Sequence, residues 1–172
     1  MNYIEKQYFR QWWLLLIVFL ALGLCGYAAV QQLCFGIPFG NNPIGNPGLI
    51  ILIALVLLLF SSLLIVRLET RIDEKGVCCR FRPFQTKSIV YTWREIDDVC
   101  VQSYRPLADY GGWGWRISLS GKGQAFNVSG NKGITVRLKN GKQRLIGTQR
   151  PDEVQRVINH FFNRPEATTP KL

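Results

Sequence analysis

Residues 12–30 read WWLLLIVFLALGLCGYAAV, and residues 49–66 read LIILIALVLLLFSSLLIV. Neither stretch contains a charged side chain, and residues 11–66 as a whole contain none. A helix needs roughly 20 mostly apolar residues to cross the hydrocarbon core of a bilayer, and in lipid its backbone groups must be paired within the segment. The two stretches therefore predict transmembrane helices, with spans over about 12–33 and 49–66.

The segment between the two spans, residues 31–48, is rich in proline and glycine and uncharged, so we expect a short turn that makes residues 12–66 a helical hairpin. Lys and Arg beside a span mark its cytoplasmic side. Residues 1–11 are therefore expected to be a cytoplasmic N-terminus, and the C-terminal part should lie on the same side of the membrane. The basic residues that flank the hairpin are Lys6, Arg10, Arg67, Arg71 and Lys75.

Almost all the charge of the chain follows the second span. The chain has 172 residues and a formal net charge of +10, and only Glu5, Lys6 and Arg10 of its charged residues precede residue 67. Short alternating runs follow, such as residues 77–82 and 96–104. Asn140-Gly141 lies between two more of them, which is a strong β-hairpin signal. Short strands spaced by turns predict about seven strands in a sandwich or barrel.

The periodicity changes from two to about 3.6 after residue 150. Pro151 suits a first helical turn, and Asp152 and Glu153 favour the positive end of the helix dipole. We therefore predict an amphipathic helix over residues 151–163 and a disordered tail over 164–172. The fold class is a membrane-anchored α+β protein. The apolar residues that define the helix face are Val154, Val157, Ile158, Phe161 and Phe162.

Several motifs in the C-terminal part resemble those of bacterial pleckstrin-homology-like domains that follow a two-span hairpin in small membrane proteins. The resemblance implies a pleckstrin-homology-like domain over residues 67–163, with its C-terminal helix closing the sheets. It also implies a multi-pass protein of the bacterial inner (plasma) membrane that serves as an interaction module and has no known reaction. The motifs are LETRI (68–72), YTWREI (91–96), PLADYGGWG (106–114), NVSGNKG (127–133) and LIGTQRP (145–151).

A basic group follows the second span and predicts lipid headgroup binding. Lys75, Arg80 and Arg82 match the loose Lys-x(n)-Arg-x-Arg pattern of phosphoinositide-binding pleckstrin-homology domains, and Lys87 adds a fourth cation. Arg80 and Arg82 are two residues apart, so they share one face of a strand and could hold a phosphate together with Lys75 in the turn. The alternative is a solvated strand face with a general attraction to anionic headgroups.

A second candidate site is the stretch DYGGWGWR, residues 109–116. Its glycines permit tight turns that other residues resist. Tyr110, Trp113 and Arg116 are candidate partner-binding residues there. We expect Trp113 to be exposed, whereas Trp115 is expected to close the core of the sheets.

The residue types disfavour catalysis and metal binding. Five cysteines with a single histidine give no zinc-ligand spacing, and no nucleophile and base pair stands out. We therefore expect no enzyme activity, metal or cofactor. Scattered basic residues interleaved with acidic ones disfavour nucleic acid. The expected partners are the bilayer, anionic headgroups, and a protein partner or a second copy. The alternative function is a structural or regulatory subunit of a larger membrane complex, contacting partners through the Tyr110–Trp115 loop.

Overall fold

The chain forms two compact units in the computed structural model, which describes residues 2–9, 11–118 and 121–162. One unit is the segment from Phe9 to Ile65. The other combines the N-terminal residues through Tyr8 with the chain from Val66 onward. The predicted disordered tail, residues 164–172, lies outside the described residues.

The first unit is a pair of apolar helices. α1, Trp12–Ala29, continues into a π-helical segment, η1, Val30–Cys34, and α2 covers Asn46–Ile65. Both are long and apolar enough to cross a membrane. Ala28 is the only buried residue of α1 and Leu49 the only one of α2, so nearly all their apolar side chains are left uncovered by the protein.

Several polar groups of this helical unit are paired locally. The hydroxyls of Ser61 and Ser62 donate to carbonyl oxygens one turn earlier in α2, at 2.7–2.9 Å. The Gln32 amide donates to the carbonyl oxygen of Ile44 at 2.7 Å and to Oδ1 of Asn46 at 2.9 Å. These bonds satisfy groups that would otherwise be costly to place in an apolar medium.

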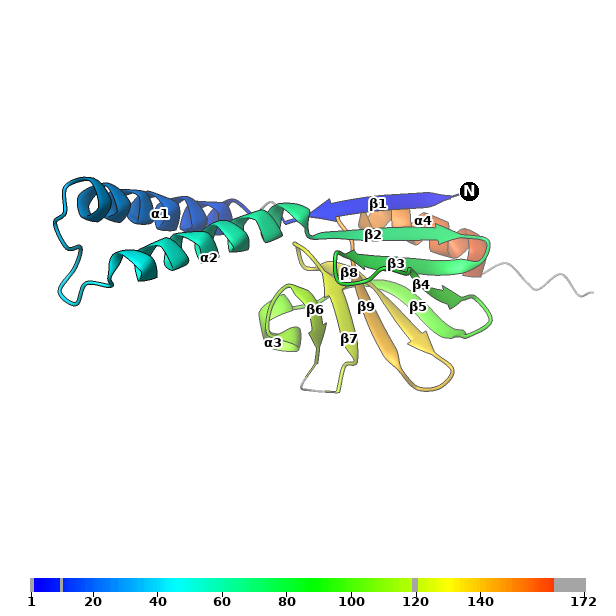
Figure 1. Cartoon of the computed structure of the whole chain (residues 1–172). Helices are drawn as coiled ribbons and strands as arrows, with labels where there is room; N and C mark the ends of the chain where they lie inside the picture. The colour runs from blue at the N-terminus through cyan, green and yellow to red at the C-terminus, as the bar shows by residue number, and fades with distance from the viewer. Residues whose placement is uncertain (1, 10, 119–120, 163–172) are drawn as a thin grey trace, which may run out of the picture. The chain divides into compact units, whose positions relative to one another are not determined.

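The second unit begins with an antiparallel sheet in the order β1-β2-β3-β4 (Figure 1). One side of this sheet is buried and the other carries most of its charged side chains, as the alternation of two predicts. The strands are β1 (Tyr3–Tyr8), β2 (Arg67–Asp73), β3 (Gly76–Arg82) and β4 (Ile89–Thr92).

A five-stranded sheet in the order β5-β8-β9-β7-β6 forms the other layer of this unit. Its pairs are antiparallel except β7–β9, which is parallel. A short helix, α3 (Pro106–Tyr110), precedes β6, and Gly111 ends it in the left-handed conformation that favours glycine. The strands are β5 (Ile96–Ser103), β6 (Gly114–Ile117), β7 (Gln124–Asn127), β8 (Lys132–Leu138) and β9 (Gln143–Gly147).

Helix α4, Pro151–Phe162, completes the core of this unit. Its Val154, Val157 and Ile158 are buried, and the helix packs chiefly against β5, with further contacts to β2 and β8 (Figure 1). Trp93 stacks on Phe161 at 5.9 Å between ring centroids. The apolar stripe predicted from the sequence is therefore the face that closes the two sheets.

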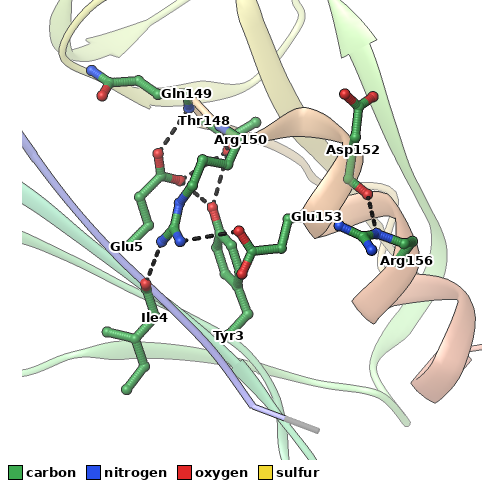
Figure 2. Close-up of polar contacts among 9 residues, drawn as sticks. All are labelled: Tyr3, Ile4, Glu5, Thr148, Gln149, Arg150, Asp152, Glu153 and Arg156. Atoms are coloured by element: carbon green, nitrogen blue, oxygen red, sulfur yellow. Dashed lines mark hydrogen bonds and ion pairs between the residues drawn. The ribbon is translucent and has the colours of Figure 1, made fainter.

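The buried side of β1 is polar, and it binds the junction between β9 and α4 (Figure 2). Glu5 is 4% exposed, and its carboxylate accepts hydrogen bonds from the Tyr3 hydroxyl at 2.6 Å, the Thr148 hydroxyl at 2.8 Å and the Gln149 backbone N–H at 2.8 Å. Burial, followed by the bond to Glu5, raises the pKa of Tyr3. Residues nearly 150 positions apart are thereby joined.

Arg150 covers this network from outside. Its guanidinium donates to the carbonyl oxygen of Ile4 at 2.5 Å and to Glu153 at 3.0 Å, and it lies 4.8 Å above the centroid of the Tyr3 ring. The amide of Gln7 donates to the carbonyl oxygen of Gly147 at 2.7 Å. The N-terminal strand is thus an integral part of the β unit.

The structure agrees with the predicted two apolar helices, the β-rich unit and the helix from Pro151. It adds β1 and α3, which the sequence analysis did not anticipate, and the described residues contain nine strands in place of about seven. The expected burial of Trp115 is wrong. This side chain is 47% exposed because β6 is an edge strand, and one face of its ring stacks on the buried Phe126 at 6.1 Å.

Candidate functional site: the basic face of the first sheet

The outward face of the four-stranded sheet gathers cations from three neighbouring strands. The register places Lys6 beside Glu69 and Glu69 beside Arg80, so these side chains form one row across the sheet. A second row contains Arg71, and a third contains Arg67 and Arg82. Glu69 and Asp73 are the acidic side chains among these cations. The face is therefore positive overall, with a carboxylate at its centre.

Most of the arginines on this face are already engaged. Arg71 pairs with Asp73 at 2.8 Å, while Arg67 and Arg82 pair with the two carboxylate oxygens of Glu69 at 2.9 and 3.6 Å. Arg80 donates to the backbone carbonyl oxygens of Gln85 at 3.2 Å and of Thr86. These bonds fix the guanidinium groups and leave part of their charge facing solvent.

Lys6 and Lys75 have no ion-pair partner within the described parts of the chain, so their ammonium groups are available to an anion. Both border a cavity of about 340 Å³ in this face. Burial, followed by the charge of Asp73, raises the pKa of the Cys78 thiol on the same cavity wall, so the thiol stays protonated at neutral pH. The charged lining residues are Lys6, Glu69, Arg71, Asp73, Lys75 and Arg80.

The structure brings together only part of the predicted basic group. Lys75 and Arg80 share the cavity, but Arg82 lies outside its lining and pairs with Glu69. Lys87 is exposed in the β3–β4 connection. Lys6 is not among the predicted site residues, because the sequence does not predict the strand that carries it.

The second candidate site separates into buried and exposed side chains. Tyr110 is only 6% exposed, and its hydroxyl bonds the carbonyl oxygen of Lys122 at 3.3 Å, so it belongs to the core. Trp113 is half-buried and donates to the carbonyl oxygen of Gly130 at 3.1 Å. Arg116 is exposed, and its Nε donates to the carbonyl oxygen of Trp113 at 3.2 Å.

Exposed apolar side chains and Arg116 line a depression of about 700 Å³. Leu107 is 68% exposed and Ile117 is 66% exposed, and the outer face of Trp115 adds to them. Asp109 is bound by Lys122 at 2.8 Å and by the backbone N–H of Arg105, which together lower its pKa. We call Leu107, Trp115 and Ile117 the α3–β6 patch.

No known protein-family model matches this chain, and no curated protein is significantly similar to it. Within the described residues, no group of three or more His, Cys, Asp or Glu side chains could hold a metal ion. The interpretation of function therefore depends on the two surfaces themselves.

Proposed function

We propose that this protein is a membrane-anchored, non-catalytic interaction module of the bacterial inner membrane. Its two apolar helices span the bilayer, and its β unit, of a pleckstrin-homology-like kind, presents the basic face of the first sheet to anionic lipid headgroups. The observation that carries the proposal is the cluster of Lys6, Arg71, Lys75 and Arg80 around one cavity.

The connectivity of the chain supports the anchoring. β1 leads into α1, β2 follows α2, and Tyr8 pairs directly with Arg67. Because the two strands are hydrogen-bonded neighbours, both ends of the hairpin must lie on one side of a membrane that the helices span. The β unit is held there by two connections, and the positive-inside rule makes that side the cytoplasm.

The charge pattern supports anionic headgroups as the ligand. Basic side chains near a membrane surface contribute about 1 kcal/mol each to its attraction for anionic lipid. Here the bound arginines give a fixed positive surface, and the two unpaired lysines add mobile charges that can follow a phosphate. Acidic Glu69 and Asp73 orient the arginines and limit the attraction to a moderate strength.

The test uses the full chain in lipid nanodiscs of phosphatidylcholine with or without phosphatidylglycerol. Acylation of lysine amines is read by mass spectrometry, with Lys142 of the β8–β9 turn as the exposed internal control. We expect Lys6 and Lys75 to be protected only in the anionic discs, and the protection to weaken in high salt because salt screens exposed charges. Equal reactivity of both lysines in the two lipids would contradict headgroup binding.

The α3–β6 patch favours a second candidate function, contact with a partner protein or a second copy as part of a larger membrane complex. Singly exposed apolar residues are ordinary, but here three of them adjoin on an edge strand and a short helix beside a depression. A photo-crosslinking residue in place of Ile117 should capture a discrete protein in native membranes. If only unmodified chain is recovered, the partner function loses its support.

A further inference from the structure

One turn of the β unit lies at the end of the first sheet where the chain connects to the helices. The register pairs Tyr8 with Arg67 and Arg67 with Arg82, so these three residues share that end of the sheet. β3 ends at Arg82, and the connection to β4, residues 83–88, therefore begins there. The other turn of this sheet, at Glu74 and Lys75, lies at the opposite end.

The connections to the helices are short. Residues 9–11 separate β1 from α1, and Val66 alone separates α2 from β2. An extended chain advances at most about 3.5 Å per residue, so Arg67 can lie only several ångström from the end of a span that finishes at Ile65. This step rests on the proposed function, in which the helices cross the bilayer.

The turn between β3 and β4 has the composition of a membrane-interface segment. Phe84 is 64% exposed, and Lys87, three residues further along the same turn, is also exposed. Arg82 precedes the turn at the end of β3. Aromatic rings accompanied by basic side chains are favoured at the boundary between headgroups and acyl chains. A ring exposed to this extent is unfavourable in water, so burial in that boundary would stabilise it.

The turn holds Phe84 in place. The Gln85 backbone N–H donates to the carbonyl oxygen of Phe81 at 2.9 Å, and the Gln85 side chain accepts from the Phe81 N–H at 3.0 Å. Arg80 binds the carbonyl oxygens of Gln85 and Thr86. The Phe84 ring stacks on the buried Phe81 ring at 6.0 Å with an interplanar angle of 18°. Little conformational freedom is left to lose on insertion.

We propose that the β3–β4 turn inserts Phe84 into the interfacial layer of an anionic bilayer, with Arg82 and Lys87 on the neighbouring headgroups. The turn is then a third attachment of the β unit to the membrane, besides the two connections to the helices. A lipid surface fits better than a protein partner, because the register holds the turn at the end of the sheet where β1 and β2 connect to the helices, and the charges that flank the turn are all positive.

The test places the photo-crosslinking residue p-benzoylphenylalanine at position 84 of the full chain in phosphatidylglycerol-containing nanodiscs. The matched control has the same residue at position 142, an exposed site in the β8–β9 turn of the other sheet. Phospholipid adducts are measured by mass spectrometry. We expect abundant adducts at position 84 and only background at position 142, with both variants as resistant to protease as the unmodified chain.

Equal yields of lipid adducts at the two positions would overturn the proposal, as would a protein adduct at position 84. If Phe84→Ser leaves the lipid protection of the neighbouring Lys87 amine unchanged, insertion of the ring is also contradicted. Failure of this inference is separable from failure of the proposed function. If anionic lipid protects Lys6 and Lys75 from acylation but position 84 forms no lipid adducts, only the insertion of the turn is rejected. If carbonate releases the chain from membranes, the membrane anchoring by the helices is rejected.

Discussion

Replacing Glu5 with alanine is expected to destabilise the β unit strongly, although Glu5 lies in an N-terminal strand ahead of the helices. The Glu5 carboxylate is 4% exposed and accepts three hydrogen bonds, from Tyr3, Thr148 and the backbone of Gln149, at 2.6–2.8 Å (Figure 2). The alanine side chain would leave these donors buried without an acceptor. The strand would lose its main polar attachment to the β9–α4 junction.

The size of the effect follows from the number and type of these bonds. A hydrogen bond to a charged group contributes about 1.5–3 kcal/mol, and a buried donor left unpaired costs about 1–3 kcal/mol. Removing the carboxylate also removes the cost of burying its charge. We therefore expect the Glu5→Ala variant to lose about 3–5 kcal/mol, a large part of the 5–15 kcal/mol that is typical of a domain.

The assay is urea unfolding of the full chain in nonionic detergent. Trp12 and Trp13 of α1 are replaced by phenylalanine in every variant, so the fluorescence comes from Trp93, Trp113 and Trp115, which all lie in the β unit. With a urea dependence of about 1–3 kcal/mol per molar, the midpoint should fall by about 2 M. Lys6→Ala is the matched control, since the neighbouring Lys6 points outward and its replacement should change stability by less than about 0.5 kcal/mol. Glu5→Gln, which keeps an acceptor, should fall between the two. Equal midpoints for Glu5→Ala and Lys6→Ala would contradict a stabilising role of the buried carboxylate.

Three further predictions concern the same unit. Replacing residues 9–66 with Asn-Gly should give a water-soluble, folded β unit, because Tyr8 and Arg67 are paired and this dipeptide suits a two-residue hairpin. Cooperative urea unfolding checks that the shortened protein is folded. Deletion of residues 1–8 from the shortened protein should abolish the cooperative transition. Burial raises the pKa of Tyr91 from 10.0 to about 12, so the unfolded state releases the Tyr91 proton at a lower pH than the folded state. The free energy of unfolding therefore falls as the pH rises from 10 to 12. Denaturation curves measured across this range should show a smaller decline for Tyr91→Phe. Burial likewise raises the pKa of the Cys79 thiol to about 12. N-ethylmaleimide should therefore modify the exposed Cys34 but spare Cys79 until urea unfolds the chain. Rapid modification of Cys79 in the folded protein would contradict its burial.

The sequence predicted the strands from β2 to β9 because their inward positions are mostly apolar and alternate, and the turn signals between them are strong. β1 escaped prediction because its inward side chains include Glu5 and Gln7, while Ile4 points outward, so its hydrophobic pattern is inverted. Only the distant Thr148 and Gln149 explain why a carboxylate is buried there.

The candidate sites show the same limit. The alternation of Arg80 and Arg82 placed both on one face, but pairing of Arg82 with Glu69 depends on the register of β2 against β3. Lys6 joins the cavity through the pairing of β1 with β2, which links residues some sixty positions apart and leaves no local signal. By contrast, Pro106 before a short polar and apolar run and Gly111 after it are ordinary helix start and stop signals, from which α3 could have been predicted.

The orientation of the chain in a sealed membrane decides whether the two helices span the bilayer and hold the β unit in the cytoplasm. Reporter cysteines at Asn41, between the helices, and at Glu74, in the β unit, are introduced separately into a chain in which the native cysteines other than buried Cys79 are replaced by serine. Bacteria expressing each variant are treated with a membrane-impermeant maleimide before and after permeabilisation. We expect labelling of Asn41→Cys in intact cells and of Glu74→Cys only after permeabilisation. Labelling of Glu74→Cys in intact cells, or of both positions from the same side, would contradict it.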